Sequence, residues 1–184
     1  MLHTFVVYVE NKPGVLNRVA SLFRRRAFNI ESLTAGHTER PGVTRMTISL
    51  EADETTALRI EALLYKLVNV LFVEDVTARP IVTRDLAMIK VKADNESRTG
   101  LMQIASTFRG RVVDLAPESL IIEVTGSEEK IDSLLDVLKP YGVLEMTRTG
   151  RVAMARGAHA PQFDAEARAD WAEGEGEEET VFED

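Results

Sequence analysis

Residues 11–16, Asn-Lys-Pro-Gly-Val-Leu, have the types and spacing that suit the binding of a small ligand. They follow a run of β-branched and aromatic residues and precede apolar residues at helical spacing, so they join a strand to a helix. The first N–H groups of a helix have no partner inside the helix. Together with the helix dipole, these N–H groups attract an anion such as a carboxylate.

The side chains of this segment favour the same kind of ligand. Gly14 lets a ligand approach the backbone closely, and Pro13 fixes the entry into the helix without losing a donor that the helix would use. The amide of Asn11 can both donate and accept hydrogen bonds. The segment therefore suits a small zwitterion, although an ordinary turn and helix cap would have the same pattern.

The sequence contains few candidate catalytic residues. The three histidines, His3, His37 and His159, lie far apart in the sequence, and packed or solvated histidines are the simpler interpretation. The chain has no nucleophile elbow, no Walker loop, no His-Glu-x-x-His helix and no metal-ligand spacing. Because it has no cysteine, disulfides and thiolate zinc sites are excluded. The sequence therefore gives little support to a small enzyme.

Hydrophobic periodicity predicts the elements that position residues 11–16. We expect four strands, which are rich in β-branched or aromatic residues or alternate apolar with polar ones, at residues 3–10, 29–38, 43–50 and 70–76. Apolar residues at helical spacing predict one helix after the first strand and a second helix before the fourth. The turn at residues 39–42 makes the two middle strands an antiparallel hairpin. The order βαββαβ is that of a ferredoxin-like split unit.

The same order recurs in the second half of the chain. Strands are predicted at residues 86–91, 112–115, 119–124 and 143–147. Apolar residues at helical spacing predict one helix between the first two of these strands and another between the last two. We therefore predict an α+β protein with two consecutive ferredoxin-like βαββαβ domains, at residues 1–79 and 80–157. A short linker around Pro80 joins them.

The acidic residues are concentrated at the end of the chain. Residues 161–184 hold ten acidic residues and one arginine, a net charge of −9, whereas the rest of the chain is close to neutral. We expect residues 158–184 to form a disordered acidic tail. The tail is either inert or a peptide that folds onto a basic partner surface through its apolar residues, Trp171, Val181 and Phe182.

The near-neutral body gives no electrostatic support for binding to nucleic acid. An RNA-binding module of this topology would need aromatic residues on its central strands, and Tyr8 is the only plausible one on the first strand. The N-terminus does not have the pattern of a secretory signal, and no apolar run approaches the roughly 18 residues that span a bilayer. We therefore expect a cytoplasmic protein without nucleic-acid or membrane partners.

Two segments together resemble a known family. Residues 11–16 and residues 28–34, Phe-Asn-Ile-Glu-Ser-Leu-Thr, are similar to the ACT domain of acetolactate synthase small subunits. Further similar segments are residues 44–48, 66–71 and 108–110. The resemblance covers roughly residues 2–155, and it implies an ACT regulatory domain followed by the C-terminal ferredoxin-like domain of the small subunit.

The resemblance implies a non-catalytic regulatory subunit in the biosynthesis of branched-chain amino acids. In this family the ACT domains pair side by side in a homodimer, and valine or a related amino acid binds at the interface. The loop of one chain, with Asn11, Gly14, Val15 and Leu16, would face Asn29 and Ile30 of the other. Effector binding there would produce feedback inhibition by valine, leucine or isoleucine.

The resemblance also implies a partner, the large catalytic subunit, which carries thiamine diphosphate, Mg²⁺ and FAD and which the small subunit activates. No cofactor is expected on this chain. The alternative is an ACT-type amino-acid sensor that regulates a different protein. In the second repeat, residues 95–100 replace the Pro-Gly turn and Asp114 replaces Asn29. We therefore expect residues 81–157 to bind partners rather than an amino acid.

Overall fold

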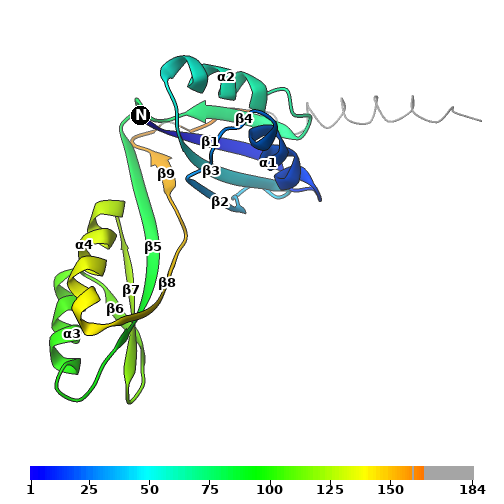
Figure 1. The fold of residues 1–184 in the computed structure, drawn as a ribbon. Coiled ribbons are helices and arrows are strands. Elements are labelled where there is room, and N and C mark those ends of the chain that lie inside the picture. The colour runs from blue at the N-terminus through cyan, green and yellow to red at the C-terminus, as the bar shows by residue number, and fades with distance from the viewer. Residues whose placement is uncertain (159, 164–184) are drawn as a thin grey trace, which may run out of the picture. The chain divides into compact units, whose positions relative to one another are not determined.

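The computed structural model describes residues 1–158 and 160–163, which form two compact units. The first unit comprises Met1–Ile81 together with the described residues from Ala153 onward, and the second comprises Val82–Val152 (Figure 1). The chain therefore leaves the first unit, forms the second and returns. Most of the predicted acidic tail, His159 and residues 164–184, lies outside the described residues.

The first unit has the βαββαβ order that the sequence predicts. Its elements are β1 (Leu2–Glu10), α1 (Val15–Arg25), β2 (Ser32–His37), β3 (Val43–Glu51), α2 (Glu54–Leu64) and β4 (Val70–Asp75). The strands form one antiparallel sheet in the order β2-β3-β1-β4. Because β1 and β2 both run antiparallel to β3, they run parallel to each other, and β2 is an edge strand.

The register of this sheet decides which loops lie at which end. At one end, Ser32 of β2 lies opposite Ser49, which lies opposite Thr4 near the beginning of β1. At the other end, His37 lies opposite Thr44, which lies opposite Val9. The residues before β2 and the loop after β1 are therefore at opposite ends of the sheet, separated by most of the length of β1.

The core of the first unit lies between the sheet and its two helices. Successive side chains of a strand point to opposite faces. Phe5, Val7 and Val9 of β1 accordingly face one side, where they are buried against Phe23 of α1 and Ile60 of α2. Both helices therefore cover the same face of the sheet (Figure 1).

The opposite face of this sheet receives the chain on its return. β9 (Val152–Ala155) follows the second unit, and Ala153 is buried against Val6 and Val76, with Tyr8 and Ile81 packed around them. This strand was not predicted, because four residues are too few to show a periodicity. The helix-free face is thus partly covered by residues that are remote in sequence.

The second unit repeats the same architecture. Its elements are β5 (Ile81–Lys92), α3 (Arg98–Thr107), β6 (Arg111–Leu115), β7 (Ser119–Gly126), α4 (Glu128–Leu138), a short 3₁₀ turn (Lys139–Tyr141) and β8 (Val143–Arg148). The strand order is β6-β7-β5-β8, and β9 pairs with β5. The α+β class and the two βαββαβ units that the sequence predicts are confirmed. β5 begins directly after Pro80, so the predicted linker leads straight into a strand.

The second strand begins later than the sequence predicts. Asn29 and Ile30 lie in the connection after α1, and pairing with β3 starts where the N–H of Glu31 donates to the carbonyl oxygen of Ser49 at 2.9 Å. The chain leaves α1 through Ala27, whose φ of +56° reverses its direction. The residues that follow this turn complete the change of direction, so Asn29 precedes the strand and is not its first residue.

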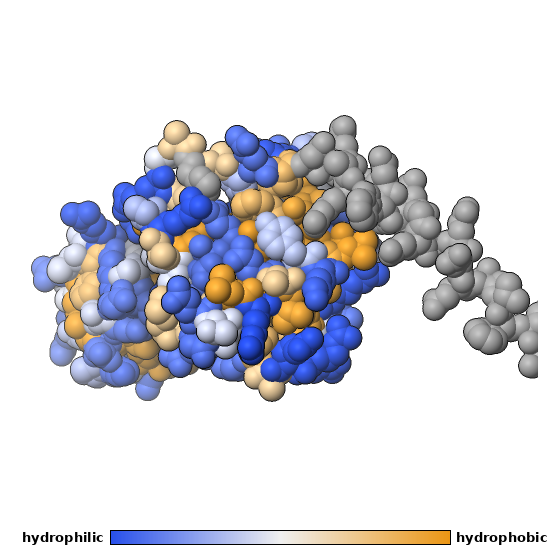
Figure 2. All heavy atoms as spheres, turned by 90° about the horizontal axis from the view of Figure 1, so that it is seen from above, coloured by the Kyte–Doolittle hydropathy of each residue, from blue (hydrophilic) through white to orange (hydrophobic). Residues whose placement is uncertain are grey.

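Exposed apolar residues are scattered on the described surface. On the face shown in Figure 2, apolar side chains lie among hydrophilic ones. Leu16 on α1 and Leu58 on α2 are examples of exposed apolar side chains, which are common on folded proteins. None of the described helices is long and apolar enough to cross a bilayer.

Candidate functional site

The loop between β1 and α1 is held by its backbone and is open to solvent. The N–H of Asn11 donates to the carbonyl oxygen of Gly42 at 2.7 Å, and the N–H of Lys12 donates to that of Glu10 at 2.9 Å. The side chains of residues 11–14 are exposed. The loop thus has a defined backbone while its side chains and the beginning of α1 remain accessible.

The beginning of α1 lacks the side-chain cap that α2 and α4 have. Gly14 is its N-cap residue and provides no side-chain hydrogen bond, and the first turn of α1 contains no acidic residue. By contrast, Asp53 caps α2 and Ser127 caps α4 through their side-chain oxygens. The positive end of the helix dipole is therefore not compensated at α1, which favours an anion there.

Gly14 also leaves space at this helix end. Its φ is +83°, a left-handed conformation that glycine adopts without strain. A Cβ atom at this position would meet no atom within 4 Å. Glycine is therefore required here by the backbone conformation rather than by a neighbouring group, and the volume next to it is open to a ligand.

A network of side chains fixes the base of the loop. The amide nitrogen of Asn69 donates to the carboxylate of Glu10 at 2.5 Å, and its oxygen accepts from the guanidinium of Arg18 at 2.9 Å. Lys12 forms an ion pair with the same carboxylate at 3.3 Å. Sequence reasoning missed these positioning residues, because Asn69 is 58 positions from Asn11 and nothing local shows their contact.

The apolar residues of the predicted site have different environments. Val15 is only 4% exposed and belongs to the core, and its N–H donates to the carbonyl oxygen of Lys12 at 3.4 Å. Leu16 is 47% exposed. Of the two, Leu16 is the side chain that can contact a ligand bound at the beginning of α1.

The structure does not bring Asn29 and Ile30 to the loop within one chain. They precede β2, at the end of the sheet opposite to the loop. The amide nitrogen of Asn29 donates to the carboxylate of Glu31 at 2.6 Å, and Ile30 packs against the edge of the core. A site that contains both segments therefore needs two copies of the chain.

In the corresponding loop of the second unit, a carboxylate of the chain itself lies where an anion would bind before the helix. The carboxylate of Asp94 accepts from the N–H groups of Ser97 at 2.7 Å and Glu96 at 3.1 Å, directly before α3. The hydrogen bonds from the Ser97 hydroxyl and backbone are the main reason why the pKa of Asp94 is lowered. Asp94 also lines the hollow beside this loop. A ligand carboxylate would therefore meet a negative charge here, whereas the first turn of α1 in the first unit contains no acidic residue.

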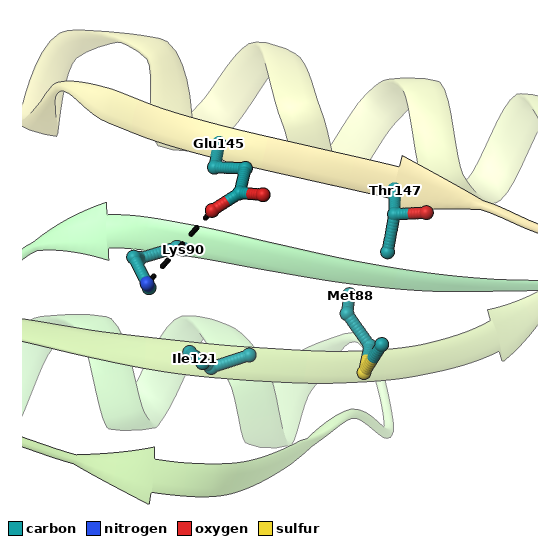
Figure 3. Close-up of a pocket in the computed structure, with 5 residues that line it drawn as sticks. All are labelled: Met88, Lys90, Ile121, Glu145 and Thr147. Atoms are coloured by element: carbon teal, nitrogen blue, oxygen red, sulfur yellow. Dashed lines mark ion pairs between the residues drawn. The ribbon is translucent and has the colours of Figure 1, made fainter.

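The helix-free face of the second sheet is a different kind of surface. Figure 3 shows a shallow hollow on it, lined by Met88, Lys90, Ile121, Glu145 and Thr147. Lys90 and Glu145 form an ion pair at 3.8 Å across neighbouring strands. The charges next to the apolar side chains are thus paired with each other, and the hollow offers a small zwitterion no buried polar group.

The histidines do not form a catalytic arrangement in the described part of the chain. His3 is 4% exposed, and its Nδ1 lies 2.6 Å from the carboxylate of Asp75. His37 is exposed on β2, and His159 lies outside the described residues. Among the described residues, no three histidine or acidic side chains are grouped so that they could hold a metal ion.

Comparison with known proteins gives the family. Residues 5–72 match the model of the ACT domain of acetohydroxyacid synthase small subunits, and residues 84–157 match the model described as the small subunit of acetolactate synthase. The first match lies within the first unit, and the second covers most of the second unit and continues through β9, whose residues from Ala153 onward belong to the first unit.

Individual relatives agree with these models. The chain is 48% identical over 157 residues to the "Probable acetolactate synthase small subunit" of Archaeoglobus fulgidus, covering 85% of this chain and 98% of that one. It is 46% identical to the acetolactate synthase small subunit of Mycobacterium bovis, with coverages of 84% and 92%. The crystal structure of the Thermotoga maritima small subunit superposes with a TM-score of 0.81 at 40% identity, covering 86% and 99%. The chain therefore belongs to the family of small regulatory subunits of acetolactate synthase.

Proposed function

We propose that two copies of this chain bind valine, or a related branched-chain amino acid, between their ACT units and thereby regulate the catalytic subunit of acetolactate synthase. The observation that carries this proposal is the open beginning of α1. Gly14 provides neither a side-chain cap nor an obstacle there, whereas Asp94 occupies the corresponding position in the second unit.

The chemistry of an amino acid fits the groups around this helix end. Its carboxylate accepts from the N–H groups of the first turn of α1, where the helix dipole favours a negative charge. Its ammonium group donates to the amide oxygens of Asn11 and of Asn29 from the second copy. The exposed side chain of Leu16 and the half-buried side chain of Ile30 contact the aliphatic side chain of the ligand.

The topology of the sheet supports a site shared by two copies. β2 is an edge strand, and edge strands are suited to pairing with another chain. If two β2 strands pair antiparallel about a two-fold axis, the beginning of one lies beside the end of the other. His37, at the end of β2, is level with Val9, which is two residues before Asn11. This pairing therefore brings Asn29 of one copy toward the loop of the other.

Regulation follows from differential affinity. An effector can shift the catalytic subunit between two states only if it binds the small subunit more tightly in one of them. We expect the amino acid to stabilise the less active arrangement and the small subunit alone to activate. In this proposal thiamine diphosphate, Mg²⁺ and FAD are bound by the catalytic subunit, in the cytoplasm, and this chain holds none of them.

A complementation experiment tests whether the site is shared. Asn11→Ala and Asn29→Ala chains are each purified and titrated with valine by calorimetry, and are then mixed, unfolded and refolded together. Each variant dimer has lost both sites, whereas a mixed dimer keeps one intact site from the loop of one chain and Asn29 of the other. We expect the mixture to regain valine binding, with Asn95→Ala in the second unit as a control that binds normally.

The contrary results are equally specific. A mixture that binds valine no better than either variant refutes the shared site. A wild-type chain that binds no branched-chain amino acid, even together with the catalytic subunit, refutes the effector role. Copurification of the wild-type chain with a protein other than the acetolactate synthase catalytic subunit would favour an ACT-type regulator of another partner.

A further inference from the structure

Phe163, at the end of the described chain, lies in a site on the helix-free face of the first sheet. Its ring centroid is 4.9 Å from that of Tyr8 on β1 and 6.0 Å from that of Phe72 on β4. The guanidinium of Arg40 lies 4.5 Å from the centre of the Phe163 ring and also donates to its carbonyl oxygen at 3.2 Å. Aromatic and cation–π contacts of this kind are individually favourable.

The segment that carries Phe163 is anchored at its other end as well. Ala153 is buried in the cluster with Val6 and Val76, and its carbonyl oxygen accepts from the guanidinium of Arg45. The same guanidinium donates through Nε to the hydroxyl of Tyr8 at 3.1 Å. Tyr8 is thus contacted by Arg45 and by Phe163, so both anchors of the returning segment meet at one side chain.

Arg40 connects this site to the loop between β1 and α1. Arg40 belongs to the turn between β2 and β3, which the Thr38 hydroxyl closes by accepting from the N–H of Arg40 and donating to its carbonyl oxygen, both at 3.1 Å. Two residues later, the carbonyl oxygen of Gly42 accepts the N–H of Asn11 at 2.7 Å. The turn therefore binds Phe163 on one side and the loop on the other.

We propose that Phe163 is an intramolecular ligand of this site and that its docking holds the loop between β1 and α1 in the arrangement described here. This inference rests on the proposed effector role of that loop, and it adds a means of regulation. Anything that displaces Phe163 loosens the turn at residues 38–43 and so lowers the affinity of the loop for an amino acid. By linkage, amino-acid binding strengthens the docking of Phe163.

The docking of Phe163 has a further consequence, because of the residues that follow it in the sequence. The acidic residues of the C-terminal segment begin directly after Phe163, and residues 164–184 carry a net charge of −9. The docking of Phe163 therefore fixes the position of the residue that directly precedes the strongly acidic segment in the sequence. Because effector binding strengthens the docking of Phe163 in this proposal, it also holds that preceding residue more firmly.

The test uses the full chain and three variants. Phe163→Ala removes the ring, Phe163→Trp keeps an aromatic ring, and Gln162→Ala changes the exposed neighbouring side chain. Amide exchange of Asn11 is followed by NMR without ligand, and valine affinity is measured by calorimetry. We expect Phe163→Ala to speed exchange at Asn11 by about fivefold or more and to weaken valine binding by a similar factor. Phe163→Trp and Gln162→Ala are expected to behave as the wild type.

The two measurements separate this proposal from the effector function. If valine binds but Phe163→Ala changes neither exchange nor affinity, the docking proposal is overturned and the effector function stands. Faster exchange at Asn11 with unchanged affinity also overturns the linkage. If the wild type binds no branched-chain amino acid even together with the catalytic subunit, while Phe163→Ala still speeds exchange, Phe163 does hold the loop, and it is the effector function that fails.

Discussion

The amide nitrogen of Asn69 donates a 2.5 Å hydrogen bond to the carboxylate of Glu10, and this contact ties the beginning of β4 to the residue before the loop. The same amide accepts from Arg18 on α1, so one buried side chain connects three elements around the proposed effector site. This arrangement depends on the tertiary structure, because Asn69 is far from both Glu10 and Arg18 in the sequence.

Asn69→Ala is expected to lower the free energy of unfolding by about 1–3 kcal/mol, because it leaves the partly buried Glu10 carboxylate without the hydrogen-bond donor that directly precedes β4. Valine affinity should fall as well, since Glu10 leads directly into the loop. Urea denaturation and calorimetry measure the two effects. Val68→Ala, an exposed change in the preceding residue, is the control. Unchanged valine affinity in Asn69→Ala would show that the network is structural only.

Gly14→Ala is expected to abolish valine binding while the protein still folds. The strain of a non-glycine residue at φ +83° is roughly 1–2 kcal/mol, and no atom within 4 Å would clash with the new methyl group. Gly150→Ala is the matched control, because Gly150 also has φ +83° but belongs to the second unit. If both variants lose the same stability and only Gly14→Ala loses binding, the methyl group occupies the space of the ligand. Normal binding by Gly14→Ala would contradict this assignment.

Asp94→Asn should make α3 less stable at neutral pH. The pKa of Asp94 is lowered in the folded chain, mainly by its hydrogen bonds from Ser97. A lowered carboxyl pKa contributes stability above the ordinary aspartate pKa, and this contribution is lost as the pH falls through the lowered value. The difference between wild type and variant should therefore shrink on acidification, as thermal unfolding at several pH values would show. Asp114→Asn, an exposed change on β6, controls for the loss of a charge, and a pH-independent difference would argue against the capping role.

Asp85→Asn is expected to stabilise the second unit at neutral pH. Asp85 is 4% exposed, and burial raises its pKa, although Arg148 and Arg151 oppose the shift. A raised carboxyl pKa means that wild-type stability is lost as the pH rises through the raised value. The advantage of the variant should therefore disappear as the pH falls toward the ordinary aspartate pKa. Arg148 keeps its ion pair with Asp132 at 2.5 Å, and a variant that is less stable at pH 7 would refute this account.

Local patterns in the sequence determined the order of the elements and the loop that forms the candidate site. Strand alternation, helical spacing and the Pro-Gly turn are properties of neighbouring residues, and so they could be recognised without a structure. The spacing of Asp94 and Ser97 is also a local capping signal, which sequence reasoning overlooked in favour of residues 95–100.

Only the tertiary structure decided which distant residues meet. It placed Asn29 and the loop at opposite ends of one sheet, because β1 and β2 run parallel and are separated by β3. It brought Asn69 to Glu10, and it returned β9 and Phe163 to Tyr8 on the helix-free face. These contacts join segments separated by between 59 and 155 positions, and such pairings depend on the packing of the whole sheet rather than on any local pattern.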